Sequence, residues 1–255
     1  MPTSVQKAMS ILTAMSGIPF DGITLGEISD ATGINKSTCV HILNSLREQN
    51  YVEKISHSKG YRLGPGIYYL TRYGRFQEEL IQICHPVMSW VHRKTGHTVL
   101  LAVIHENKKY IVHYIEGVRR LEEKKSNLYR GNVYASGTGR VMLSYFSRSE
   151  LNAFVNEIGL PAEKVWPEIR NFENLWQELR LIRKQQVLYY SMVDDNVLDR
   201  GFASPVCEGS GKCVGAIAIS MPKSQNPFEE TEIDEFCLIL GKAGREINRR
   251  MEYYS

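Results

Sequence analysis

The segment from Gly33 to Gly64 constrains the fold of this chain more than any other stretch. A glycine turn leads to Asn35, whose side chain can cap a helix, and apolar residues then recur at helical spacing as far as Glu48. These apolar residues are Cys39, Ile42, Leu43 and Leu46. Two short runs, YVEKI and GYRL, flank the polar sequence SHSK, as in two strands joined by a turn. The segment therefore predicts a turn, a helix and a hairpin.

Two more helices are predicted before this segment. Residues 4–17 place apolar side chains at helical spacing, and Gly17 is expected to end the helix. The apolar residues of this first helix are Val5, Ala8, Met9, Leu12 and Met15. Thr24 followed by Glu27 is a capping box, which indicates the start of a second helix. Three helices and a hairpin together predict a winged helix-turn-helix domain in residues 1–64.

The outward face of the third helix has the chemistry of a DNA-binding surface. With the apolar stripe turned inward, this helix exposes hydroxyl, amide and imidazole groups that can reach base edges, beside cations that can bind phosphates. The residues expected to contact DNA are Asn35, Lys36, Ser37, Thr38, His41, Asn44 and Arg47 of the helix, with Lys59 and Arg62 of the hairpin. Acidic residues of the same domain nearly offset the basic ones, so a protein-interaction module with no DNA role remains the alternative.

A linker helix is expected in residues 65–77, and a larger domain in residues 78–255. The helical spacing of apolar residues continues through a break at Gly74, which separates the linker helix from the first helix of the larger domain. Strands are predicted at HTVLLAVIH, KYIVHYIEG, VLYYSMV, GFASPVCEG and KCVGAIAISMP. Ser147 and Asn171 are expected to cap helices between these strands, and a long helix closes the chain. Helices around an antiparallel sheet predict an α+β fold.

The larger domain lacks the residue spacing of common catalytic motifs. GSGKC, residues 209–213, has Val206 where a phosphate-binding loop needs glycine, and the sequence contains neither G-x-S-x-G nor H-E-x-x-H. Cys207 and Cys213 are spaced unlike paired zinc ligands. We therefore expect no catalytic residue, no cofactor and no metal site. A small-molecule enzyme is the weaker alternative.

The sequence ASGTG, residues 135–139, is a candidate anion-binding turn at the start of a helix. Glycines let backbone amides approach a bound group, and Ser136 and Thr138 add hydroxyls. Such a turn suits a carboxylate. The alternative is that Ser136 only caps the helix.

Several of these stretches resemble the IclR family of bacterial transcriptional regulators. SVQKAMSIL is similar to the first helix of that family, and NKSTCVHILNSL, NYVEK and YRLG are similar to its recognition helix and wing. In the larger domain, ASGTGR, ASPV and AIAISMP are similar to its effector-binding stretches, with weaker agreement. The resemblance implies a DNA-binding domain joined to a GAF-like domain that binds a small organic acid.

The resemblance also implies which residues line the effector pocket. Carried over by position, they are Ser136, Gly137, Thr138, Asp194, Asp195, Gly201, Ala218 and Ser220. Gly201 and Ala218 are smaller than the usual side chains of the family, which predicts a roomier pocket and a larger acid, such as a sugar acid. His41 stands where an arginine is common, so the operator sequence cannot be taken from relatives. Asn50 replaces a usual glycine at a helix end, where Asn tolerates the left-handed conformation.

Length and composition set further expectations. A chain of 255 residues, 43% hydrophobic and 23% charged, is long enough for two globular domains, and its net charge of +3 permits an anionic partner. It has no apolar run of the ~20 residues that span a bilayer and no signal peptide, so we expect a cytoplasmic protein with no membrane partner. Its five scattered cysteines are typical of reduced thiols.

The expected function is that of a ligand-responsive transcription factor that binds double-stranded DNA. One recognition helix reads only a few base pairs, so we expect a palindromic operator and a symmetric homodimer or homotetramer. The first helix, through Met9, Leu12 and Met15, is expected to form part of the subunit contact. The effector is expected to be a small carboxylate that shifts the protein between arrangements with different DNA affinity.

Overall fold

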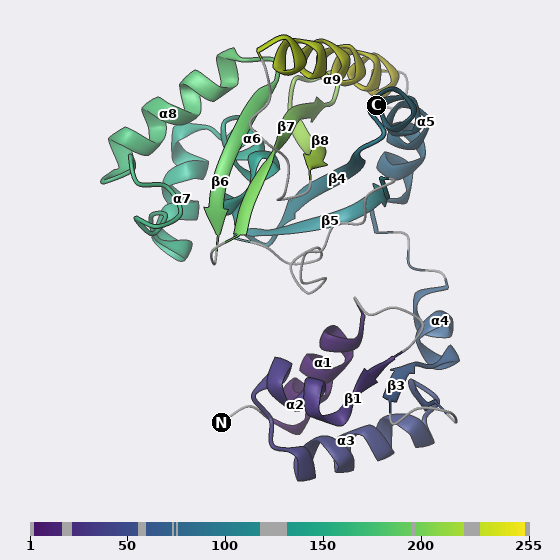
Figure 1. The fold of residues 1–255 in the computed structure, drawn as a ribbon. Coiled ribbons are helices and arrows are strands. Elements are labelled where there is room, and N and C mark those ends of the chain that lie inside the picture. Colours follow the sequence, from purple (N-terminus) through teal and green to yellow (C-terminus); the bar gives the residue numbers. More distant parts are fainter. Residues whose placement is uncertain are drawn as a thin grey trace. The chain divides into compact units, whose positions relative to one another are not determined.

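The structure, a computed structural model, describes residues 3–16, 22–55, 60–72, 74, 76–117, 132–194, 197–221 and 230–252, without the side chains of 192–194 and 197–199. The chain forms two compact units (Figure 1), of which the first covers Met1–Phe76 and the second begins at Gln77. Helices and antiparallel strands occur in both units, so the fold is α+β, as predicted. Within the described residues, no helix is both long enough and apolar enough to cross a membrane.

The first unit is a winged helix-turn-helix. Its helices are α1 (Ser4–Met15), α2 (Leu25–Thr32), α3 (Lys36–Glu48) and α4 (Pro65–Thr71), and its strands are β1 (Ile23–Thr24), β2 (Val52–Lys54) and β3 (Gly60–Leu63). The strands form an antiparallel sheet in the order β1-β3-β2. Ile11, Ile28 and Leu43, one from each of the first three helices, are fully buried in a shared core.

The ends of these helices follow the predicted capping residues. Thr24 and Glu27 form the capping box of α2, and the side chain of Asn35 accepts a hydrogen bond from the backbone N–H of Thr38 at 2.9 Å. Asn50 follows α3 with a φ of 61°. It therefore adopts the left-handed conformation that Asn tolerates better than most residues.

The orientation of α1 differs from the prediction. Ile11 is fully buried and Met15 is 4% exposed, whereas Val5 is 72% and Met9 57% exposed. The predicted apolar stripe therefore splits, and only its end at Leu12 and Met15 faces the core. The pattern was ambiguous because Ile11 lies beside the stripe and completes a second apolar face at helical spacing. Met15 belongs to the core, so its predicted role in a subunit contact is wrong.

The second unit is built around a five-stranded antiparallel sheet. Its strands are β4 (Thr98–His105), β5 (Lys108–Ile115), β6 (Leu188–Asp194), β7 (Val197–Cys207) and β8 (Cys213–Met221), in the order β5-β4-β8-β7-β6. Its helices are α5 (Glu78–Thr95), α6 (Gly137–Leu143), α7 (Arg148–Ile158), α8 (Phe172–Lys184) and α9 (Glu230–Met251). Helices α5 and α9 pack together on one face of the sheet, and α6 packs on the other (Figure 1).

Strand alternation places the predicted pocket residues on the α6 face. Successive side chains of a strand point to opposite faces of the sheet. Phe202 and Ile219 join the apolar core formed with α5 and α9. Their neighbours Gly201, Ala218 and Ser220 therefore face α6.

Two strands differ from the prediction, although the helix starts at Ser147 and Asn171 are confirmed. Strand β7 begins at Val197, before the expected start at Gly201, because its first residues pair with β6. Strand β1 was not predicted. A strand of two residues is too short to show the alternation that identifies strands in a sequence.

Candidate functional sites

The exposed face of α3 presents the side chains predicted to meet DNA. Ser37, His41 and Asn44 are exposed, whereas Cys39 and Leu43 on the opposite face are fully buried. Lys36 and Arg47 are also exposed, and Thr38 is half-buried. The predicted orientation of this helix is therefore confirmed, because burial of its apolar stripe leaves the polar groups outside.

A groove runs between α3 and the β2–β3 hairpin. Its volume is ≈ 830 Å³, and it is lined by Asn44, Arg47, Glu48, Val52, Glu53, Lys54, Ile55 and Arg62. Three of these residues are cations and two are anions. Lys54, which is exposed, was not among the predicted DNA contacts, although its place at the end of a predicted strand could have suggested it.

Three of the predicted DNA contacts, Arg62, Arg47 and Asn44, already have partners within this groove. The guanidinium of Arg62 binds the carboxylate of Glu53 at 2.8 Å across the hairpin. Arg47 Nη1 lies 3.4 Å from Asn44 Oδ1 and donates a hydrogen bond to it. Arg62 would have to exchange its Glu53 partner for a phosphate, whereas Arg47 can orient the amide of Asn44. Lys59 lies outside the described residues.

Two of the predicted effector residues, Ser220 and Gly201, lie in one row that crosses four strands of the sheet. Ser220 on β8 is paired with Thr98 on β4 and with Gly201 on β7, and Gly201 is paired in turn with Tyr190 on β6. Directly opposed residues of an antiparallel sheet point to the same face. Ala218 lies one step further along the same face of β8, so the structure brings Gly201, Ala218 and Ser220 together.

The start of α6 is closed by hydrogen bonds among its own residues. Ser136 Oγ accepts a hydrogen bond from the backbone N–H of Gly139 at 3.1 Å, and Thr138 Oγ1 donates to Ser136 Oγ at 3.5 Å. Ser136 and Thr138 are 5% and 3% exposed. The role of Ser136 as a helix cap is confirmed, and both hydroxyls are buried at the start of α6.

Tyr190 connects the two parts of the predicted pocket, and sequence reasoning missed it. A Cβ atom added to Gly137 would overlap the ring of Tyr190, and one added to Gly201 would lie 2.8 Å from the Tyr190 hydroxyl oxygen. The Tyr190 side chain is itself buried. The small size of Gly201 therefore makes room for Tyr190 and for the carbonyl of Ile219, not for a larger ligand. The predicted roomier pocket is wrong in this respect.

Asp194 is the last residue of β6, and Asp195 lies outside the described residues, as does the side chain of Asp194. Asp194 is paired with Val197, and Tyr190 is paired with Gly201. The backbone of Asp194 therefore lies four residues beyond Tyr190 along β6, which is about 13 Å at the usual rise per residue. The structure does not bring the Asp194 backbone beside Ser220 and Gly201.

Arg140 anchors α6 from its other side. Its Nε donates to the carbonyl of Tyr134 and its Nη2 to the carbonyl of Val165, both at 2.9 Å. The guanidinium carbon lies 3.7 Å from the ring centroid of Trp166. Burial lowers the pKa of Arg140 to about 10, which leaves it charged at neutral pH. Its contacts are structural and fix the position of the helix that carries Ser136 and Thr138.

The sequence patterns that define two known domains match this chain. The IclR helix-turn-helix domain matches residues 4–56, and the C-terminal domain of the bacterial transcriptional regulator IclR matches residues 76–249. This chain belongs to the IclR family. It is therefore a transcriptional regulator with a helix-turn-helix DNA-binding domain and a C-terminal domain for a small-molecule effector, and it is not an enzyme.

Curated IclR-family relatives align along nearly the whole chain. The regulator KdgR of Escherichia coli is 26% identical over 254 residues, which cover 99% of this chain and 94% of KdgR. KdgR of Dickeya chrysanthemi is 25% identical over 252 residues, which cover 99% of this chain and 81% of that protein. The family resemblance inferred from the sequence is thereby confirmed.

A solved IclR-family structure shares the fold. An IclR homologue from Microbacterium hydrocarbonoxydans, crystallised with 4-hydroxybenzoate, superposes with a TM-score of 0.70 over 98% of this chain and 100% of that chain. The two sequences are 17% identical, so the likeness concerns the fold alone. Among the residues that the structure describes, no group of three His, Cys, Asp or Glu side chains is placed to hold a metal ion.

Proposed function

We propose that this IclR-family regulator binds a palindromic operator in the bacterial cytoplasm as a homodimer or homotetramer. We also propose that a small carboxylate, bound between α6 and the sheet of the effector domain, changes its operator affinity. The observation that supports DNA reading is the exposed polar face of α3, opposite an apolar face on which Cys39 and Leu43 are fully buried. In the helix-turn-helix arrangement, such a helix enters the major groove and its side chains meet base edges.

The buried hydroxyls of the effector domain support the second part of the proposal. Ser136, Thr138 and Ser220 are each at most 5% exposed; the first two stand at the start of α6, and Ser220 lies on β8, against which α6 packs. Hydroxyls and backbone amides at such a place can donate to a carboxylate. The Microbacterium relative was crystallised with 4-hydroxybenzoate, which is itself a small carboxylate. Asp194 is left out of this proposed site, because its backbone lies four residues beyond Tyr190 along β6, and Asp195 lies outside the described residues.

Tyr190 bears on the size of the proposed effector. A sugar acid was expected from the small side chains at Gly201 and Ala218, but the Tyr190 side chain occupies the space beside Gly201. A small keto acid or aromatic acid would need less displacement of that side chain than a sugar acid. We therefore expect a sugar acid to bind well only where the Tyr190 side chain moves out of the site.

The DNA part is tested by selecting duplexes from a random pool with the wild-type protein. Asn44→Ala should lower affinity for the selected duplexes by about tenfold to a hundredfold, the value of one base contact of about 1–3 kcal/mol, and should leave binding to scrambled duplexes unchanged. Asn152→Ala is the matched control, because it removes the same side-chain amide from the exposed surface of another helix, α7. Failure of the wild type to enrich any sequence over several salt concentrations would instead support the protein-interaction module.

The ligand part is tested by calorimetry with keto acids, aromatic acids, sugar acids and their amides. Acids should bind at least roughly tenfold more tightly than the matching amides, because charge-assisted hydrogen bonds are stronger than neutral ones. Ser220→Ala should weaken the tightest binder. Ser204→Ala is the matched control, because Ser204 is equally buried in the sheet but faces α9, beside Gly244. An uncharged or cationic tightest binder, or equal effects of the two substitutions, would contradict the proposal.

A further inference from the structure

Two cysteines face each other at the hairpin that joins β7 to β8. Cys207 and Cys213 are directly paired across the two strands, and both carry free thiols. The strand register shifts between Val206 and Cys207, directly beside this pair, and the backbone N–H of Cys207 donates to Asn248 Oδ1 on α9 at 2.9 Å. Opposed residues of an antiparallel pair have Cα atoms about 4.5–5.5 Å apart, which lies within the range of about 4.4–6.8 Å that a disulfide spans.

The surroundings of the pair make the two thiols unequal. The pKa of Cys207 is lowered, first by a hydrogen bond from Cys213 and then by one from Tyr145 and by the charge of Arg183, which together outweigh the opposing effect of its burial. The guanidinium carbon of Arg183 lies 4.7 Å from the ring centroid of Tyr145, which places this cation beside the thiols. The pKa of Cys213 is raised, first by its hydrogen bond with Cys207 and then by desolvation, although Cys213 Sγ also donates to the carbonyl of Gly215 at 3.1 Å. Cys207 is therefore the better nucleophile.

The other three cysteines lack this arrangement. Cys39 and Cys84 are fully buried, and burial raises the pKa of both, for Cys84 to about 12. The pKa of Cys237 on α9 is also raised, by burial and by the charge of Asp234. A thiol with a raised pKa is a poor nucleophile at neutral pH, so these three cysteines serve as internal references.

We propose that Cys207 and Cys213 form a thiol pair that a hydroperoxide converts reversibly into an intramolecular disulfide. The Cys207 thiolate attacks one peroxide oxygen and breaks the O–O bond, which gives a sulfenic acid on Cys207 and one water or alcohol after protonation. Cys213 then attacks the Cys207 sulfur, and the sulfenic oxygen leaves as water. The two thiols lose two electrons and two protons in total, and the peroxide is reduced.

The position of the pair connects this chemistry to the effector domain. Strands β7 and β8, which the disulfide would join at their hairpin end, also hold Gly201 and Ser220. Tyr145, the hydrogen-bond donor to Cys207, follows the end of α6 by two residues. In proteins of reducing compartments, a disulfide is usually a redox-sensing or catalytic feature. The inference needs neither an operator nor an effector, so it stands apart from the proposed function.

The test is a peptide map of the full-length protein after treatment with hydrogen peroxide. Trypsin cleaves after Arg200, Lys212 and Lys223, so the two cysteines fall in separate peptides. We expect one new species in which peptide 201–212 is joined to peptide 213–223, which disappears when dithiothreitol is added. Free thiols of the denatured protein should fall from five to three. Cys213→Ser should stop the reaction at a sulfenic acid on Cys207, which dimedone traps.

Cys237→Ser is the matched control and should still lose two thiols, whereas Cys207→Ser should lose none at the same peroxide concentration. The wild-type map is decisive even where a serine variant fails to fold. The proposal is overturned by a wild-type protein that keeps all five thiols, or by a disulfide that involves Cys237 or a second chain. A loss of two thiols from Cys207→Ser would also overturn it.

Discussion

Tyr190 shows how one residue can decide the shape of the candidate effector site. Its side chain lies against Gly137 at the start of α6 and reaches toward Gly201 on the neighbouring strand. Each glycine leaves the space that a methyl group would otherwise fill, so the tyrosine and the two glycines depend on one another. Substitution of any one of them should therefore change the energetic effect of substituting the other two.

Gly137→Ala is expected to destabilise the protein by about 1–3 kcal/mol, because the added methyl group would overlap the Tyr190 ring. Tyr190→Ala removes the ring at a cost of about 3–5 kcal/mol, as for other large aromatic residues. The double variant should lose less unfolding free energy than the sum of the two single losses, by roughly 1 kcal/mol or more, because the added methyl group then has room. Denaturant unfolding of the four proteins measures this coupling.

Gly139→Ala provides the control for this cycle. Its methyl group would overlap the backbone carbonyl of Val133, which cannot rotate away as a side chain can. Combining Gly139→Ala with Tyr190→Ala should therefore give additive losses, within about 0.5 kcal/mol. Additive losses for Gly137→Ala as well would show that the Tyr190 ring does not occupy the space beside Gly137.

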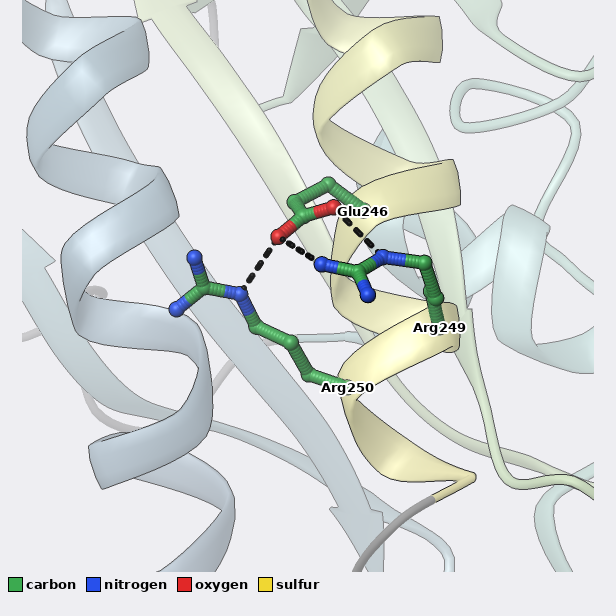
Figure 2. Close-up of polar contacts among 3 residues, drawn as sticks. All are labelled: Glu246, Arg249 and Arg250. Carbon is green, nitrogen blue, oxygen red and sulfur yellow. Dashed lines mark hydrogen bonds and ion pairs between the residues drawn. The ribbon is translucent and has the colours of Figure 1, made fainter.

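Helix α9 carries a cluster of charges where it packs beside α5. Figure 2 shows Glu246 accepting hydrogen bonds from Arg249, at 3.0 and 3.1 Å, and from Arg250, at 2.8 Å. The two guanidinium groups lower the pKa of Glu246 to about 2. Both arginines lie in the last turn of the helix, where cations also interact favourably with the helix dipole.

Glu246→Gln should lower the melting temperature at pH 7. The difference in melting temperature from the wild type should become smaller as the pH falls. The pKa of Glu246 is about 2 in the folded protein and 4.5 for an ordinary glutamate. The ionised carboxylate therefore stabilises the fold in full above about pH 4.5. This stabilisation is lost as the pH falls from 4.5 toward 2. Melting temperatures of wild type and variant between pH 7 and pH 3 should therefore converge. Glu235→Gln on the same helix is the control, and a difference that stays constant over this range would contradict the prediction.

At the scale of the whole molecule, the first unit exposes apolar side chains that need a partner surface. Val5 and Met9 on α1 are 72% and 57% exposed, and Tyr68, Tyr69 and Leu70 on α4 are each at least 66% exposed. Apolar surface of this kind on a DNA-binding domain suits contact with a second copy, since two half-sites require two recognition helices. The subunit contact we propose therefore uses Met9 and α4, without Met15.

Met9→Glu and Leu70→Glu should each reduce the fraction of dimer and weaken operator binding, because a carboxylate would be buried in the subunit contact. Sedimentation measured over a range of protein concentrations gives the fraction of dimer. Leu181→Glu on α8, where the leucine is 52% exposed, is the matched control and should change neither. A wild-type protein that sediments as a monomer both alone and on selected duplexes would contradict the proposed dimer.

Much of the fold could be predicted from local patterns. The capping residues Thr24, Asn35 and Ser147 mark helix starts that the structure confirms, because a cap acts within three or four residues of the chain. The outward face of α3 followed from its apolar period alone, since only one strong stripe was present. Helix α1 was misjudged because its apolar residues allow two faces, and only contact with α2 and α3 selects one of them.

The sequence by itself determined the family, the α+β fold and the outward face of α3, since these depend on periods, caps and motif order within short segments. Only the tertiary structure decided the contacts between distant segments. Tyr190 meets Gly137 and Gly201 through strand register, and Cys207 meets Cys213 with Tyr145 and Arg183 beside them. No local pattern encodes such neighbours, because they are set by the packing of α6, α8 and the sheet around one another.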